Sequence, residues 1–133
     1  MIQRIQSLFL LICSTLNLLY CYHLYFGNEI SKFFLDTESN IPFEVILLFP
    51  LGISLISFYN IFKYKNRQAQ FVLNRLSIII CFVFIGILIF VFDVISSFKF
   101  MNLVPLFSIL LLVLANRAIK KDEDLIRSID RIR

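Results

Sequence analysis

The sequence contains few residues of the kinds that form turns or bind metal ions: three Gly, three Pro, three Cys and one His in 133 residues. With so few Gly and Pro, turns are few and the elements between them are long. The single histidine, His23, has no second histidine with which to hold a zinc or haem iron. Charged residues make up 17% of the chain, compared with about 25% in a typical soluble domain. The shortage of charge places the chain outside the soluble class, and the lone histidine argues against a metal centre.

Motifs that carry catalysis are also missing. The sequence contains no Gly-rich phosphate loop, no nucleophile elbow and no zinc-binding pair. Cys13 and Cys21 lie eight residues apart in a predicted helix, about 12 Å along its axis and beyond the reach of a disulfide. We expect these two and Cys81 to remain reduced thiols that pack as small apolar side chains. The sequence therefore predicts no catalytic residue, no metal, no cofactor and no enzyme activity.

What the chain has in abundance is long runs of Leu, Ile, Val and Phe. Hydrophobic residues make up 59% of it, and the mean hydropathy is +0.86. About 20 apolar residues in a helix span the hydrocarbon core of a bilayer. The runs predict four transmembrane helices, at about residues 5–26, 43–62, 74–93 and 101–115. The predicted fold is all-α: an integral membrane four-helix bundle over residues 1–115 with a helical extension.

Basic residues predict the orientation of the four spans. Eleven of the 13 Lys and Arg residues precede the first span, separate the second from the third, or follow the fourth; only Lys32 and Lys99 lie on the other side. Because Lys and Arg concentrate in cytoplasmic segments, both termini are predicted to be cytoplasmic. Tyr20, Tyr22 and Tyr25 fall near the predicted outer boundary, where amphipathic rings are common. The net charge of +4 is thus explained by topology and by anionic lipid headgroups, and predicts no nucleic-acid partner.

The segment after the fourth span, residues 116–133, is predicted to be a cytoplasmic amphipathic helix. No Gly or Pro occurs between Leu106 and Arg133, so the helix of the fourth span can continue into this tail. Four aliphatic residues recur in the tail at helical spacing and form one stripe: Leu125, Ile126, Ile129 and Ile132.

We expect this apolar stripe to be covered, because its side chains together are costly to leave in water. Three covers are open: the cytoplasmic loop around Phe71, Val72 and Leu73, the same stripe of a second copy, or another protein. Binding to the membrane surface is less favourable, because Asp122, Glu123, Asp124 and Asp130 would be repelled by anionic lipid. The stripe is therefore a candidate site for docking a partner.

Polar residues inside the predicted spans are the remaining candidates. Asn17 in the first span is expected to form hydrogen bonds to a neighbouring helix, together with Ser14, Thr15, Ser54 and Ser57. The alternative is that these groups line a small polar path. Asp93 follows the third apolar run; it either sits structurally at the outer headgroup level or has a proton- or cation-linked role.

The two ends of the chain resemble a known family. The opening residues 1–8 and the closing residues 114–123, with Arg127-Ser128, Asp130-Arg131 and Arg133, look like a bacterial family of small four-span membrane proteins whose function is unknown. The resemblance extends over the whole chain in length and layout. It implies a multi-pass protein of the bacterial inner (plasma) membrane and supplies no activity, substrate or catalytic residue.

Three functions are compatible with these features. The first is an accessory or scaffold component that acts through protein–protein contacts, with a membrane protein or a second copy as partner besides the lipid bilayer. The alternative is a small transporter or channel-like bundle. Small four-span exporters need a carboxylate deep in the first span, and residues 5–28 contain no such group. A lipid-modifying enzyme ranks last because no catalytic group of residues is visible.

Overall fold

The computed structural model describes residues 2–26, 43–63, 66–90 and 103–132, except for the side chains of residues 2–4, 43 and 130–132. These residues form four α-helices: α1 (Ile2–Phe26), α3 (Phe43–Phe62), α4 (Arg67–Phe90) and α5 (Val104–Ile132). No strand occurs within the described ranges. The predicted all-α class and four-helix bundle are confirmed.

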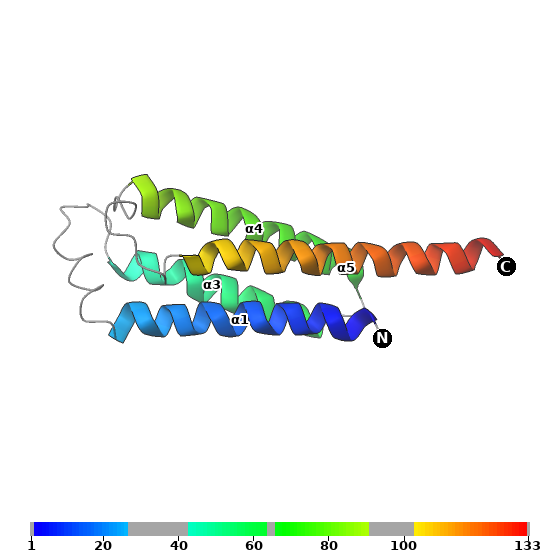
Figure 1. Ribbon diagram of the computed structural model, residues 1–133, viewed down its shortest axis with the longest axis horizontal. Helices are drawn as coiled ribbons and strands as arrows, with labels where there is room; N and C mark the ends of the chain where they lie inside the picture. The colour runs from blue at the N-terminus through cyan, green and yellow to red at the C-terminus, as the bar shows by residue number, and fades with distance from the viewer. Residues whose placement is uncertain (1, 27–42, 64–65, 91–102, 133) are drawn as a thin grey trace.

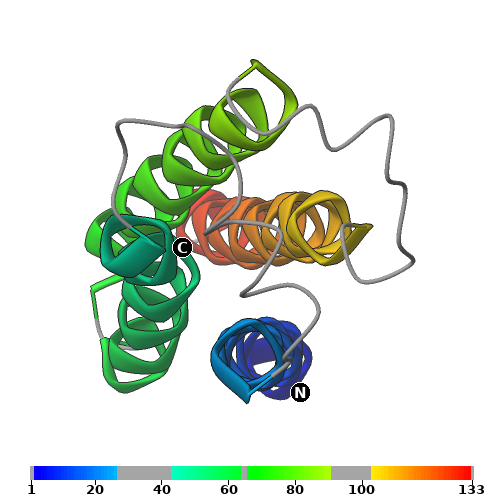
Figure 2. The same cartoon turned by 90° about the vertical axis from the view of Figure 1, so that its left-hand side faces the viewer.

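The helices form an up-and-down bundle in which chain order is also spatial order. Successive helices run in opposite directions, so both chain termini lie at the same end of the bundle (Figure 1). The end-on view in Figure 2 shows the helices around a common core; the main contacts join α1 to α3 and α5, and α4 to the same two helices. The final turns of α5 continue beyond the ends of the other helices (Figure 1). We refer to the end that carries the termini as the terminal end.

Three of the helices are long and apolar enough to cross a membrane: Ile5–Phe26, Glu44–Phe62 and Arg67–Phe90. Helix α5 is not among these, because its apolar part ends near Ala115 and a charged segment follows within the same helix. Part of the predicted fourth span, residues 101–102, lies outside the described residues. The fourth crossing therefore stays a prediction.

Helix α4 begins well before the third predicted span. Asn66 caps it: its side-chain Oδ1 accepts a hydrogen bond from the backbone N–H of Ala69 at 3.2 Å, and its carbonyl accepts one from Gln70 at 3.1 Å. The loop expected around residues 71–73 is therefore wrong; these residues lie in the second turn of α4. Hydropathy alone places the polar residues between the cap and the apolar run in a loop, although none of them breaks a helix.

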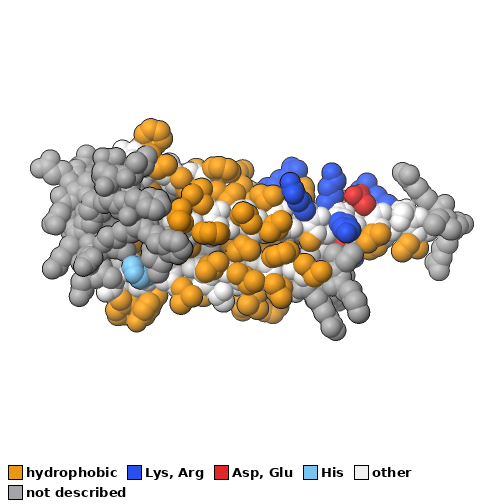
Figure 3. Space-filling model, viewed as in Figure 1, with side chains coloured by type: hydrophobic (Ala, Val, Ile, Leu, Met, Phe, Trp, Pro, Cys, Tyr) orange, Lys and Arg blue, Asp and Glu red, His pale blue; other side chains and the backbone are white. Residues whose placement is uncertain are grey.

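The core contains nearly as many polar as hydrophobic side chains. In α4 the buried face reads Gln70, Asn74, Ser77 and Cys81, followed by Phe84 and Leu88, at helical spacing. The outward surfaces of the helices, by contrast, carry many exposed large hydrophobic side chains (Figure 3). Water would penalise such a surface, whereas lipid solvates it well. The distribution fits a bundle with apolar surroundings.

The end of the bundle away from the termini has an aromatic and aliphatic core. It is built from Tyr20 and Leu24 of α1, Ile46 of α3, and Phe84 and Leu88 of α4. Tyr20 is 1% exposed, and its ring meets the Phe84 ring edge-on at 6.2 Å between centroids. Tyr20 thus lies near the end of α1 with its ring in the core, whereas Tyr22 and Tyr25 are exposed.

Candidate functional site

A buried polar cluster joins α1 to α3 and α5 near the middle of the bundle. The Asn17 side-chain amide donates to the Ser108 hydroxyl on α5 at 2.8 Å and to the Cys13 carbonyl, one turn earlier, at 2.8 Å. The Ser57 hydroxyl on α3 lies 3.8 Å from the Cys13 sulfur, within reach of a weak hydrogen bond. Asn17 thus makes the interhelical contact expected for it, to a serine that sequence reasoning did not single out.

A second polar cluster joins α3 to α4 closer to the terminal end. Asn60 of α3 donates from its side-chain amide to Asn74 Oδ1 at 2.7 Å and to the Gln70 carbonyl at 3.1 Å. Gln70 returns a hydrogen bond from its side-chain amide to the Asn60 carbonyl at 2.9 Å. All three residues are 3% exposed or less. This reciprocal arrangement fixes the register of the two helices around their short connection.

Several amide atoms at the same level of the bundle have no hydrogen-bond partner among the described residues. They are Gln6 Nε2, Asn60 Oδ1, Asn74 Nδ2 and Asn116 Oδ1, one from each of the four helices. Two are donors and two are acceptors. The layer therefore holds both unused donors and unused acceptors. It has no ionisable group with which to relay a proton.

Sequence reasoning missed this amide layer, although a signal for it is present. The sequence analysis does not single out Asn60 or Asn74, and it places Gln70 in the loop before the third predicted span. The signal is the recurrence of polar side chains every three or four residues, from Gln70 through Asn74 and Ser77. In a membrane bundle such a stripe indicates the inward face.

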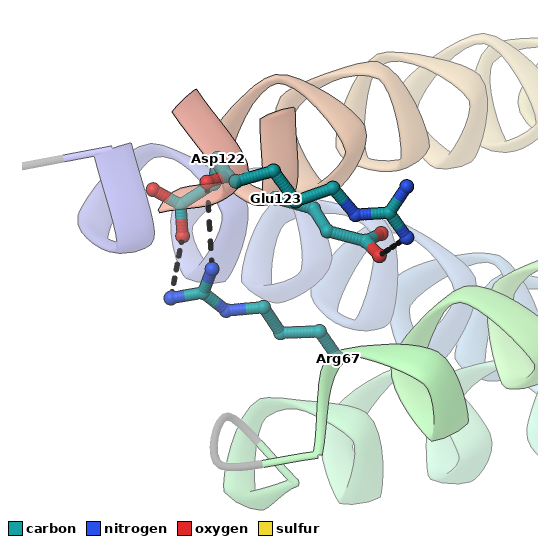
Figure 4. Close-up of polar contacts among 4 residues, drawn as sticks. Arg67, Asp122 and Glu123 are labelled. Carbon is teal, nitrogen blue, oxygen red and sulfur yellow. Dashed lines mark hydrogen bonds and ion pairs between the residues drawn. The ribbon is translucent and has the colours of Figure 1, made fainter. Parts of the chain in front are cut away.

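An ion pair connects the start of α4 to the projecting part of α5. Arg67 approaches Asp122 with Nη2 3.1 Å from Oδ2, and its Nη1 donates to the Asp122 carbonyl at 3.4 Å (Figure 4). The two side chains are 23% and 15% exposed. Within α5, Arg127 Nη2 lies 2.6 Å from Glu123 Oε1. The acidic residue precedes the basic one by four positions, which is the favourable order in a helix, and the pair is largely exposed to solvent. The Arg67–Asp122 contact is the ion pair that the described residues show between α5 and another helix.

The final turns of α5 project beyond the other helices (Figure 1), and the described residues leave the apolar stripe on them largely uncovered. Leu125, Ile126 and Ile129 are 44%, 41% and 59% exposed. Ile132 ends the helix, and its side chain lies outside the described part. Of the covers predicted from the sequence, the segment at residues 71–73 does not bury the stripe. A second copy and another protein remain.

The remaining candidate residues are Asp93 and the three cysteines. Asp93 lies outside the described residues, so neither of its two predicted roles is tested. Cys13 and Cys81 are buried thiols, and Cys21 is partly exposed. Within the described ranges, no three His, Cys, Asp or Glu side chains come together in a way that would hold a metal ion.

The comparisons with known proteins identify the family but no activity. Residues 2–132 match the family described as "Domain of unknown function (DUF4293)", and the chain belongs to that family. No curated protein and no solved structure matches the chain.

Proposed function

We propose that this member of the DUF4293 family is an integral membrane protein that serves as an accessory or scaffold component, and that its projecting helix holds a second membrane protein. One observation carries the proposal. Helix α5 extends past the Arg67–Asp122 contact with Leu125, Ile126 and Ile129 exposed on one face. A stripe at this spacing suits the groove or helix of another protein, where side chains one turn apart serve as anchors.

The energetics favour a covered stripe. Full burial of an aliphatic side chain is worth about 1.5–3 kcal/mol. Because Ile126 and Ile129 are roughly half exposed in the single chain, covering each of them contributes about 1 kcal/mol. Replacing both by Ser should therefore weaken binding by roughly thirtyfold.

A partner in the same membrane fits the size of the stripe. A stable complex between soluble proteins buries about 800 Å² on each side, much more than three or four side chains supply. A partner anchored in the same bilayer is held at high effective concentration, so a small contact suffices. The continuity of the tail with α5 adds rigidity, since α5 is one helix from Val104 to Ile132. The tail thus pays little ordering entropy on binding.

The orientation we propose places this helix in the cytoplasm and the bundle in a bacterial inner membrane. We call the part of the bundle with a hydrophobic surface the apolar body. Lys and Arg side chains gather at the boundary between the apolar body and the terminal end (Figure 3). That pattern supports a cytoplasmic location for both termini under the positive-inside rule.

Site-specific photo-crosslinking in intact cells tests the proposal. A photoreactive residue at Ile129 should give a protein adduct, and the same residue at Arg127, on the opposite face of the helix, should not. The adduct yield should fall when Ile126 is replaced by Ser, since that change weakens binding about fivefold. An adduct of twice the chain's mass would assign the stripe to a homo-oligomer and overturn the partner proposal. Adducts of lipid alone, or equal adducts from both positions, would overturn it as well.

A small transporter or channel-like bundle is the second candidate, favoured by one observation. The four unpartnered amide atoms of Gln6, Asn60, Asn74 and Asn116 form a polar layer inside the bundle. The buried side chains described here include no acid or base that could couple transport to a proton or cation gradient. Uptake of a small neutral polar solute into vesicles that contain the purified protein tests this candidate; uptake that Asn74→Leu abolishes would support it.

A further inference from the structure

A hollow of about 540 Å³ opens between the first turns of α4 and the later part of α5. Helix α4 contributes Phe71, Val72 and Arg75 to its wall, and α5 contributes Lys120 and Asp124. Glu123 and Arg127, which pair with each other, complete its charged rim. Apolar, cationic and anionic groups therefore face the same space, which we call the α4–α5 groove.

Three charges in the groove are left without an ion-pair partner among the described residues. Arg75 lies over the Phe71 ring, with its guanidinium carbon 4.3 Å from the ring centroid, and forms no salt bridge. Lys120 and Asp124 likewise have none. Two free cations and one free carboxylate thus remain to bind a ligand that carries charges of both signs.

The groove lies at the level expected for lipid headgroups. Arg75 directly precedes the apolar run of α4, and the Arg67–Asp122 ion pair marks the level at which α4 begins. Eight residues of helix separate Arg75 from Arg67, or about 12 Å. The headgroup layer of one leaflet is roughly 5–8 Å deep, so it fits between these two limits.

The charges are ordered along the bundle axis. Side chains on a helix lean toward its N-terminus. Lys120 on α5 therefore leans toward the apolar body, and Arg75 on α4 leans back toward Phe71, as their contact shows. The Lys120 ammonium and the Arg75 guanidinium therefore point toward the same height along the bundle axis, from opposite directions. Asp124, one turn beyond Lys120, lies farther from the apolar body.

An apolar track leads from the groove along the outward face of α4. Val72, Leu76, Ile79 and Val83 are all exposed and follow one another at helical spacing. An acyl chain can lie along this track while its headgroup occupies the groove. The track favours a lipid over a soluble phosphate compound.

We propose that the α4–α5 groove binds a phospholipid whose headgroup carries a phosphate and a primary ammonium, as in phosphatidylethanolamine. The phosphate lies at Arg75 and Lys120, next to the apolar body. The ammonium, one headgroup length farther out, donates to Asp124. A purely anionic headgroup would leave this carboxylate unpaired. A quaternary ammonium headgroup offers it no N–H donor.

Native mass spectrometry of the full chain tests this assignment. The protein in mild detergent receives equal amounts of phosphatidylethanolamine, phosphatidylglycerol and phosphatidylcholine, and the lipid retained on the folded protein is measured. We expect phosphatidylethanolamine to be retained preferentially. Lys120→Gln should reduce its retention about fivefold, because one basic residue near a lipid phosphate is worth about 1 kcal/mol. Asp124→Asn should shift the preference toward phosphatidylglycerol.

Two controls keep the result specific. Lys121→Gln makes the same charge change on the next residue, which does not line the groove, and should leave retention unchanged. Ile126→Ser together with Ile129→Ser should also leave it unchanged, because the stripe lies on the opposite face of α5; failure of this site is therefore separable from failure of the docking proposal. Equal retention of the three lipids, or a phosphatidylglycerol preference in the unaltered protein, would overturn the inference. So would equal losses in Lys120→Gln and Lys121→Gln.

Discussion

The hydrogen bond between Asn60 and Asn74 should hold α3 and α4 together by an amount that can be measured. Its donor and acceptor lie 2.7 Å apart, and the two residues are 0% and 1% exposed. Side-chain hydrogen bonds between membrane helices average about 0.6 kcal/mol and reach about 1.7. The short distance and complete burial place this bond near the upper end. We therefore expect a coupling free energy of about 1.5 kcal/mol between the two positions.

A double-mutant cycle measures the coupling free energy between Asn60 and Asn74. The free energy of unfolding is measured for the unaltered chain, Asn60→Ala, Asn74→Ala and the double variant, by titration with SDS in mixed micelles followed by circular dichroism. The matched cycle pairs Asn60→Ala with Ser77→Ala, because the Ser77 hydroxyl donates to the Leu73 carbonyl of its own helix. That second cycle should show coupling within about 0.5 kcal/mol of zero. Equal couplings in the two cycles, or none in the first, would refute the role assigned to the Asn60–Asn74 bond.

Three further predictions follow from the same structure. Arg67→Gln should lower the free energy of unfolding by about 1 kcal/mol, whereas Arg127→Gln, whose ion pair is largely exposed, should lower it by less than about 0.5; equal losses in SDS titration would contradict the difference in burial. Cysteines introduced at Ser39 and Gln68, in a chain without its native cysteines, should react with impermeant reagents from opposite sides of the membrane, and labelling of both from outside would rule out the proposed topology. Gly86→Ala should stabilise the bundle by about 0.5–1 kcal/mol, because the added methyl group meets no atom within 4 Å; a loss of thermal stability would show that the site is tighter than the structure indicates.

The helices themselves were predictable because long apolar runs leave the backbone few alternatives. Inside a bilayer every backbone N–H and C=O needs an internal partner, so a run such as Val45 to Phe62 has to be helical. The absence of Gly and Pro after Leu106 likewise predicted that α5 would continue into the tail, and the structure has one helix from Val104 to Ile132. Where a helix begins was less predictable. The start of α4 is set by Asn66, a polar cap that hydropathy does not detect.

The polar interior was predicted only in part. Asn17 was expected to contact a neighbouring helix because an amide at depth needs a partner, but its partner, Ser108, could not be chosen from sequence. Many hydroxyls lie at suitable depth, and only the rotation of each helix decides which of them meet. The same uncertainty applies to the tail. Its stripe could be predicted, but whether the chain covers it depends on how far α5 projects past α4.

The rotation of the helices follows from their polar residues once the solvent is taken to be lipid. In a water-soluble bundle the apolar stripe of each helix marks the core, so α4 would be expected to turn Leu76, Ile79 and Val83 inward. It does the opposite: these three side chains are exposed, and the stripe that contains Asn74 and Ser77 is buried. Apolar surface gains little by leaving lipid, whereas an amide or hydroxyl gains a hydrogen bond by leaving it. Polar spacing is therefore the better guide to the core of this bundle, and it leads to the layer of amides that an apolar pattern leaves unseen.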